Sequence, residues 1–309
     1  MRRFGLMVLT LFGISIIIFM LLRLTPGNIA DILFDAGGFV DPADKARIEA
    51  DLGLDRPIPV QYVKWISGLL TGDLGISYQT ERPALQEIAP RIPITAKLAG
   101  LALAFAVLIG VPFGVISAVK QNTRLDYILR VISLTGLSMP AFWLGLLILM
   151  GFVAYFGTIP IYSDAPTGFW NAMLMYSVPA AAVGFRSSAL MLRLTRSSML
   201  EVLRQDYIRT ARSKGAPEVV INYYHALKNA ILPVVTVIGI EAAFLLGGLI
   251  VTETVFNIPG VGRLAFDAIQ KSDLPTVQGT VLMGAFFIIF LNLIVDIVYA
   301  FLDPRVRYG

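Results

Sequence analysis

Long, uninterrupted apolar stretches limit what this chain can fold into more than any other feature. Six such stretches lie at residues 4–22, 98–119, 131–157, 171–192, 231–252 and 277–301. A helix needs about 20 apolar residues to cross the hydrocarbon core of a membrane, whereas a strand of a membrane barrel needs about ten of alternating character. Charged residues make up 15% of the chain, against about a quarter in typical soluble domains. The sequence therefore predicts an all-α integral membrane protein with six transmembrane helices.

The first apolar stretch has features of both a signal peptide and a membrane anchor. It runs from Phe4 to Leu22 behind the basic start Met1-Arg2-Arg3. The stretch is longer than the apolar core of a usual signal peptide, and no small-residue cleavage site follows it. We therefore expect it to be retained as an anchor.

The distribution of lysine and arginine predicts the orientation of the chain, because short loops rich in these residues stay in the cytoplasm. The loops at 120–130 and 193–229 are basic, whereas segment 24–95 holds ten acidic and six basic residues. Both termini and the two basic loops are therefore predicted to be cytoplasmic. Segments 24–95, 158–170 and 253–276 then face outward.

The outer segment 24–95 carries apolar residues at helical spacing. Between Tyr62 and Leu70 they recur at every third or fourth position, which predicts an amphipathic helix. Gly72-Asp73 has the composition of a turn and is expected to end it. We expect short helices that form an extracytoplasmic cap. A packing lid without a partner is the alternative interpretation.

Several function classes are excluded by missing motifs. The chain has no cysteine and a single histidine, His225, so it offers neither disulfides nor a thiolate or multi-histidine metal site. The phosphate-binding pattern G-x-x-x-x-G-K-[ST] and the H-E-x-x-H and G-x-S-x-G motifs of hydrolases are absent from it. We expect a chain that is not an enzyme, has no catalytic or metal-binding residue, binds no cofactor itself and has no nucleic-acid partner.

A polar arm at 193–229 interrupts two apolar stretches. Glu201 to Lys214 shows helical spacing of apolar residues, and Gly215 is a plausible helix end because glycine adopts left-handed backbone at little cost. Ala216-Pro217 would open a second helix, since proline is tolerated in a first turn. The arm is predicted to be a helix, a glycine elbow and a second helix that another protein can grip. A solvated basic loop is the alternative.

The arm also carries a recognisable motif. Tyr207-Ile-Arg-Thr-Ala-Arg-Ser-Lys-Gly215 resembles the cytoplasmic E-A-A-x-x-x-G motif of ABC importer permeases, with Ala211 and Gly215 at matching positions and Arg209 and Thr210 in place of the Glu and the first Ala. Further stretches resemble the B-type membrane subunit of dipeptide/oligopeptide permeases. They are Leu52–Tyr62, Gly72–Ser77, Ser138–Trp143, Glu253–Arg263, Asp296–Tyr299 and Asp303–Arg305. The resemblance covers nearly the whole chain.

This resemblance implies a single transmembrane domain, 1–309, of the type I ABC importer fold in the bacterial inner membrane. It implies a second, homologous permease subunit, two cytoplasmic ATPase subunits that hold ATP and Mg²⁺, an extracytoplasmic solute-binding protein and a peptide substrate. Dipeptides, longer peptides, glutathione and nickel complexes all remain open as cargo. The residues expected to couple the chain to an ATPase are Tyr207, Arg209, Thr210, Ala211, Lys214 and Gly215.

Polar residues inside apolar stretches are candidates for the transport pathway, because charge there is costly. Glu241 lies in the fifth stretch, Asp296 in the sixth and Glu253 at the outer mouth. Pro140 and Trp143 are candidates for another reason: the third stretch is long enough to kink, and they are expected to shape a kink beside the pathway. Each also has a structural interpretation as a packing, hydrogen-bonding or helix-ending residue. If Glu241 binds an ion, the chain is instead a secondary transporter driven by an ion gradient.

Overall fold

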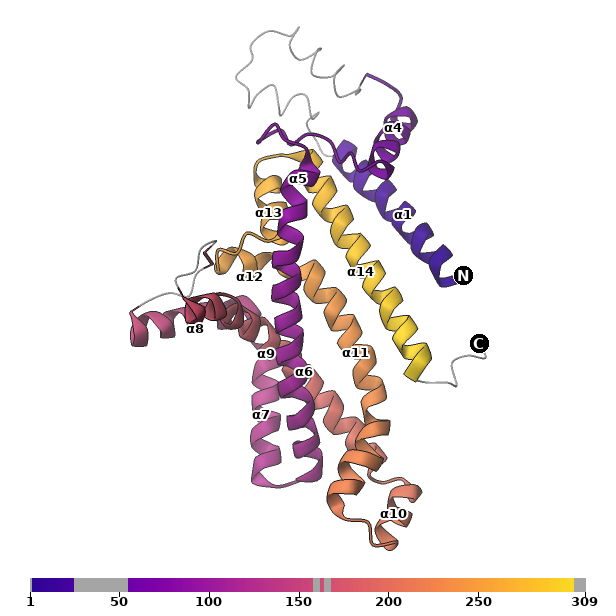
Figure 1. The fold of residues 1–309 in the computed structure, drawn as a ribbon, viewed down its shortest axis with the longest axis vertical. Coiled ribbons are helices and arrows are strands. Elements are labelled where there is room, and N and C mark those ends of the chain that lie inside the picture. The colour runs from indigo at the N-terminus through magenta and orange to yellow at the C-terminus, as the bar shows by residue number, and fades with distance from the viewer. Residues whose placement is uncertain (1, 25–54, 158–161, 164–167, 303–309) are drawn as a thin grey trace.

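The computed structural model describes residues 2–24, 55–157, 162–163 and 168–302. The regular structure in these ranges is helical, and an isolated bridge pairs Ile76 with Pro83. Long helices run along an elongated molecule (Figure 1). The predicted all-α fold class is confirmed. Residues 25–54, most of the loop 158–167 and the stretch Asp303–Arg305, all used in the sequence analysis, lie outside the described residues.

The centre of the fold is a pair of parallel helices, α6 (Ile92–Val119) and α9 (Phe169–Val202). A side chain added at Gly110 would place its Cβ 2.5 Å from the carbonyl oxygen of Ser188, and one at Gly114 would lie 2.6 Å from Cβ of Thr195. These positions belong to a stripe of small residues at every fourth position of α6, namely Ala102, Ala106, Gly110, Gly114 and Ala118. Small residues let membrane helices approach closely enough for their backbones to touch.

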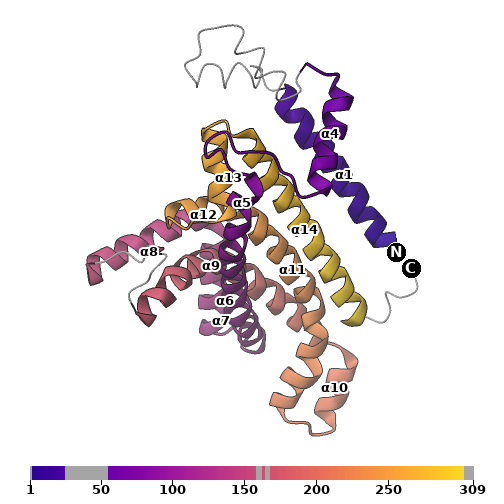
Figure 2. The same cartoon turned by 45° about the horizontal axis from the view of Figure 1, so that its top comes forward.

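Three further long helices form a layer beside this pair. Helix α11 (Leu227–Gly248) packs against α6 and α9 on one side and against α14 (Leu274–Leu302) on the other. Helix α1 (Arg2–Leu24) lies on the far side of α14 (Figure 2). Gly239 of α11 faces Val295 of α14 so closely that an added Cβ would overlap that side chain.

The third apolar stretch, expected as one crossing at 131–157, is two helices. Helix α7 (Arg124–Ser138) and helix α8 (Ala141–Phe156) meet at an angle of 106°. Met139 between them is extended, as residues before a proline usually are, and Pro140 caps α8 with an extended backbone. The prediction that this stretch can kink is confirmed, and Pro140 explains where.

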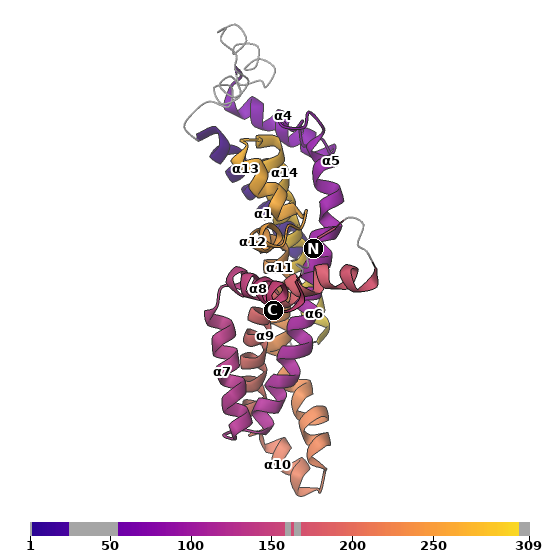
Figure 3. The ribbon, with the colours of Figure 1, turned by 90° about the vertical axis from the view of Figure 1, so that its left-hand side faces the viewer.

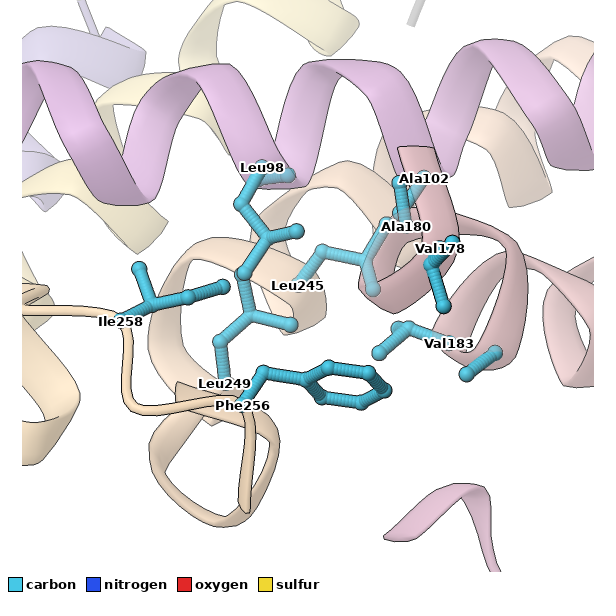
Figure 4. Close-up of a cluster of buried hydrophobic side chains, with 11 residues drawn as sticks. Leu98, Ala102, Val178, Ala180, Val183, Leu245, Leu249, Phe256 and Ile258 are labelled. Atoms are coloured by element: carbon cyan, nitrogen blue, oxygen red, sulfur yellow. The ribbon is translucent and has the colours of Figure 1, made fainter. Parts of the chain in front are cut away.

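A hydrophobic cluster joins the upper ends of the central helices. Leu98 and Ala102 of α6 meet Leu245 and Leu249 from the end of α11, together with residues of α9 (Figure 4). Phe256 and Ile258 point into it from the loop between α12 (Ile250–Val255) and α13 (Val261–Gln270). The cluster therefore fixes that loop to the membrane helices.

The outer segment docks on the helices at two places. The predicted amphipathic helix is present as α4 (Ile58–Leu70), and the turn expected at Gly72-Asp73 lies at Thr71-Gly72. Tyr62 hydrogen-bonds Ser15 of α1 at 2.8 Å, and its ring lies edge-on to Phe19. Farther along, α5 (Ala84–Ile88) and the 3₁₀ turn Ala89–Arg91 lead straight into α6, so that helix begins well before the predicted start at residue 98.

A buried aspartate holds the second docking point. Asp273, just before α14, accepts hydrogen bonds from Ser77 Oγ at 2.5 Å, from the Tyr78 backbone N–H at 3.1 Å and from Thr276 Oγ1 at 2.8 Å. The outer segment and the α13–α14 turn therefore meet at one end of the molecule, as the predicted orientation requires of two segments on the same side.

By length and composition, the described helices support fewer crossings than the predicted six. In the described ranges, 84–119, 220–247 and 274–295 are helical, long and apolar enough to cross a membrane, and the bent α7–α8 pair would add a fourth. The apolar part of α1 spans Gly5–Met20, and α9, which contains the predicted crossing 171–192, has Arg186 and two serines in its middle. The chain is a multi-pass membrane protein, and six crossings remain a prediction.

Candidate coupling elbow and polar sites

The polar arm forms an elbow at the end of the molecule opposite the outer segment (Figure 1). Helix α9 ends at Val202, a turn follows, and α10 runs from Asp206 to Ser213, so the expected single helix from Glu201 to Lys214 is wrong. The turn through Leu203–Gln205 redirects the chain so that Ile208 of α10 is fully buried.

Gly215 makes the elbow's corner, as predicted. Its φ is 78°, in the left-handed region that glycine tolerates best. The Gly215 N–H bonds the carbonyl of Arg212 at 3.0 Å, and the Ala216 N–H bonds the carbonyl of Ala211 at 3.2 Å. This pair of bonds is the Schellman arrangement that closes a helix end. The corner is therefore a defined turn.

Side chains brace the elbow on both sides of the corner. Arg212 donates from Nε and Nη2 to Glu218 at 2.7 and 3.3 Å. The same hydrogen bonds lower the pKa of the Glu218 carboxyl below its ordinary value. Ile208 packs with Met199 of α9 and Ile221 beyond the corner, in a cluster that also holds residues of α6 and α11. The elbow is thus tied to three long helices.

The second arm of the elbow begins at Glu218, as expected from Ala216-Pro217, and continues as a π-helix, η2 (Val220–Ala226), into α11. Its outward face is apolar and aromatic. Val219, Val220, Tyr223 and Tyr224 are exposed on this arm, and Tyr207 of α10, which is also exposed, accepts a 2.8 Å hydrogen bond from Asn229 Nδ2. Solvent-exposed patches of this kind mark interaction surfaces.

The residues predicted for coupling lie together on this elbow. Arg209 pairs with Asp206 one turn earlier on α10, and Thr210 donates its hydroxyl to the Asp206 carbonyl at 3.0 Å. Ala211 supplies a carbonyl to the corner, and Lys214 caps α10. Tyr207, Arg209, Thr210 and Lys214 are exposed and Ala211 is half-buried.

A buried ion pair beside the elbow was not predicted. Asp126, at the start of α7, is fully buried, and both its oxygens accept hydrogen bonds from Arg196 of α9, at 2.8 and 2.9 Å. Ser117 of α6 and the Asn122 N–H bond the same carboxylate at 2.6 and 2.9 Å. Thr123-x-x-Asp126, a helix-capping pattern, was the signal in the sequence. The pair joins α6, α7 and α9 at the ends that the charge distribution predicts to face the cytoplasm.

Glu241 lies between two central helices. It is 7% exposed on α11 and accepts a 2.6 Å hydrogen bond from Ser187 Oγ of α9. This geometry matches the alternative interpretation of Glu241 as a residue that hydrogen-bonds two helices together. Its function as a pathway or ion site remains a prediction.

Glu253 organises the outer turn from a fully buried position. Its carboxylate accepts hydrogen bonds from Thr95 Oγ1 at 2.6 Å and from the Arg263 N–H at 2.9 Å. An added Cβ at Gly260 would lie 2.1 Å from Oε1, so the glycine is needed for the carboxylate to fit. Burial raises the pKa of Glu253 above its ordinary value. Glu253 therefore lies beneath the turn between α12 and α13 and is not exposed at the outer mouth, where the sequence analysis placed it.

The remaining candidates lie apart. Pro140 and Trp143 are exposed at the α7–α8 bend, where Gly145 on the next turn packs against Phe256. Asp296 lies in α14, and its side chain is outside the described part of the chain. Among the described residues, no set of contacts brings the five predicted pathway residues together in one site.

Known proteins resemble this chain along its whole length. Residues 110–308 match the family described as binding-protein-dependent transport system inner membrane component, and residues 1–99 match the N-terminal part of such components. The dipeptide transport system permease protein DppB of Alkalihalophilus pseudofirmus is 41% identical and covers 100% of this chain and 98% of its own length. DppB of Escherichia coli K12 is 40% identical with the same coverage. The glutathione transport system permease protein GsiC of Pectobacterium atrosepticum is 40% identical over 97% of this chain and 95% of its own.

These matches and the helical membrane fold define a transport permease of the type I ABC importer class. The chain belongs to the family of binding-protein-dependent transport system inner membrane components. The resemblance stated from the sequence is confirmed, and family membership favours it over the ion-gradient-driven alternative. Permeases of this family are transport subunits, consistent with the expected lack of enzymatic activity.

Proposed function

We propose that the chain is one of two membrane subunits of an ATP-driven importer of dipeptides and related short peptides. The observation that carries the proposal is the 40–41% identity, over nearly full length, to permeases named for dipeptide transport. The relative named for glutathione, itself a small peptide-like molecule, supports the same cargo class. The sequence has no phosphate-binding loop, which supports ATP hydrolysis on partner chains that bind ATP and Mg²⁺.

The proposed path of coupling runs through the elbow. Its Schellman corner, the Arg212–Glu218 pair and the buried Ile208 make it a rigid element tied to α6, α9 and α11. Its exposed face, with Tyr207, Val219 and Tyr223, would occupy a groove of an ATPase subunit. When the ATPases close on ATP, they would move the elbow and with it the three helices. A rigid element with two positions is what coupling between distant sites requires.

The proposed orientation follows from charge. The elbow and both termini face the cytoplasm, where two ATPase subunits bind, and the end that carries α4, α13 and the Asp273 contacts faces outward, where a solute-binding protein delivers cargo. A second, homologous permease would complete the pathway. The basic loops support this orientation, because Arg193, Arg196, Arg204 and neighbouring basic residues all lie near the elbow.

Glu241 offers a test of the pathway itself. Replacing it with glutamine removes the charge but keeps an oxygen for the Ser187 hydroxyl, so the tie between α9 and α11 survives. If the carboxylate faces cargo, Glu241→Gln will weaken the preference for cationic peptides over neutral ones in uptake competition. An unchanged preference would restrict Glu241 to joining the two helices.

The proposed function is tested with the complete transporter in proteoliposomes. The chain is purified with its co-expressed permease, ATPase and binding-protein partners, and uptake of a labelled dipeptide is followed. We expect uptake to require ATP on the side of the membrane that carries the ATPase subunits and the binding protein on the opposite side. Vanadate should stop this uptake. Uptake driven by a proton gradient without ATP would overturn the proposal.

A further inference from the structure

A groove between α7 and α9 has no function in the mechanism above. It encloses about 460 Å³ at the elbow end of the molecule, where the two helices lie side by side (Figure 3). Three arginines line it: Arg130 from α7, and Arg193 and Arg196 from α9. Apolar residues line the rest, among them Val131, Leu134 and Leu192.

The described part of the chain leaves two of these three arginines without an acidic partner. Arg196 is paired with Asp126, so that pair adds little net charge. Arg130 lies over the ring of Tyr127, with 5.2 Å between its Cζ and the ring centre, and Arg193 is exposed. In the described ranges neither of these two guanidinium groups forms an ion pair with a carboxylate. The groove therefore presents two free positive charges whose planar donors match phosphate oxygens.

The groove is also polar at one end and apolar at the other. Helix α7 starts at the α6–α7 turn, so Tyr127 and Arg130 lie nearer that turn than Leu134 and Leu137. Val131 and Leu134 are each more than 60% exposed, although they are large and apolar. In the orientation proposed above, the arginines lie toward the cytoplasmic membrane surface and the apolar residues toward the hydrocarbon. That order is the order of a phospholipid, from headgroup to acyl chain.

We propose that this groove binds an anionic phospholipid of the cytoplasmic leaflet, with its phosphate between Arg130 and Arg193 and an acyl chain along Val131 and Leu134. Basic pockets between membrane helices on the cytoplasmic side suit such headgroups, and each basic residue contributes roughly fivefold in affinity. The inference rests on the orientation in the proposed function. It assigns a lipid site to the helix, α9, that leads into the elbow.

The test measures lipid retained by the purified full complex and does not depend on transport. The complex is exchanged into nanodiscs of phosphatidylcholine that contain a minor fraction of phosphatidylglycerol, and the lipid that stays bound is identified by native mass spectrometry. We expect selective retention of phosphatidylglycerol. Arg130→Gln combined with Arg193→Gln should reduce that retention by roughly 25-fold, from about fivefold for each arginine.

The matched control is Arg124→Gln, which removes an exposed arginine from the same helix without lining the groove. It should retain the lipid as the unchanged complex does. Glycerol phosphate, which carries the headgroup chemistry without acyl chains, should not displace the lipid at equal concentration, whereas a short-chain phosphatidylglycerol should. Displacement by glycerol phosphate would indicate a phosphate site and overturn the lipid assignment.

Three further outcomes would overturn the proposal. One is equal retention by the double variant, and another is equal loss in Arg124→Gln, which would mean general attraction to positive charge. The third is a cross-link from Val131→Cys to a partner subunit in the complex, which would show that protein fills the groove. Each of these can be observed even if the complex transports no peptide, so failure of the lipid site and failure of the proposed function are distinguishable.

Discussion

Two single residues set the backbone at opposite ends of the molecule. At the elbow, Gly215 adopts a φ of 78°, which is unfavourable for residues that carry a Cβ atom. At the outer end, the buried carboxylate of Glu253 accepts the hydrogen bonds that the Arg263 N–H and the Thr95 hydroxyl would otherwise donate to water. The hydroxyl of Thr95 in turn accepts the Val261 N–H at 2.9 Å, so one carboxylate orders the whole turn between α12 and α13. Both residues act through backbone geometry, so single substitutions can test their effects.

Gly215→Val should uncouple the transporter while the chain still inserts in the membrane. A β-branched residue at positive φ costs of order 1–3 kcal/mol, so the elbow should lose its shape and bind the ATPase subunits roughly tenfold more weakly or worse. ATPase co-purification and ATP-driven uptake both measure this. Gly72→Val is the matched control, because Gly72 also has positive φ with open space around it but lies at the outer end. Normal transport by Gly215→Val, or equal loss in both variants, would contradict the coupling function of the elbow.

Glu253 should make the outer turn sensitive to pH. Because burial raises its folded-state pKa above the ordinary 4.5, its stabilising contribution is complete below pH 4.5 and is lost as pH rises through the raised pKa. The melting temperature of the complex should therefore fall with rising pH in that window, and Glu253→Gln should remove this part of the change. Glu81→Gln, an exposed change of the same kind at the same end, should leave the dependence intact. Identical pH profiles for the unchanged complex and Glu253→Gln would refute the assignment.

At the scale of helices, the parts that follow from local pattern were predictable. Gly215 and Pro217 marked the elbow, Tyr62–Leu70 marked α4, and Pro140 marked the bend. The break after Val202 was not predictable, because it depends on Ile208 finding a buried place among helices that are distant in sequence. The Asp126–Arg196 pair and the Glu253 network likewise join residues far apart in the chain. The small-residue stripe on α6 was visible in the sequence, but its partner, α9, was not.

The α6–α9 contact should be intolerant of any added side chain. At Gly114 a new Cβ would lie 2.6 Å from Cβ of Thr195 and 2.8 Å from the Leu192 carbonyl oxygen, which is backbone and cannot move aside cheaply. Gly114→Val should therefore destabilise the complex by about 1–3 kcal/mol or more, seen as a lower melting temperature and lower yield. Gly100→Val is the matched control on the same helix, where nothing lies within 4 Å. Equal melting temperatures for the two variants would mean that the helices do not meet as described.

At the scale of the whole molecule, the fold separates two ends that the proposed function needs to keep on opposite sides of a membrane. The elbow and the α6–α7 turn lie at one end, joined by a cluster that includes Ala118 and Ile208. The outer segment and the α13–α14 turn lie at the other, joined through Ser77 and Asp273. Because these contacts hold the segments of each end together, the segments at one end must lie on the same side of the membrane. Locating one segment on a side of the membrane therefore locates the others.

The lack of native cysteine allows that claim to be tested directly. Single cysteines at four exposed positions, Gln121→Cys, Ser213→Cys, Glu81→Cys and Lys271→Cys, can be labelled in right-side-out membrane vesicles with an impermeant maleimide. Positions 81 and 271 should react from outside, and positions 121 and 213 only after the vesicles are permeabilised, because the first pair lies at the α4–α13 end and the second at the elbow. Labelling of 81 and 271 from opposite sides would contradict the fold, since Asp273 binds the outer segment directly. Labelling of all four in the reverse sense would preserve the fold but invert the orientation, and would remove the elbow from reach of cytoplasmic ATPases.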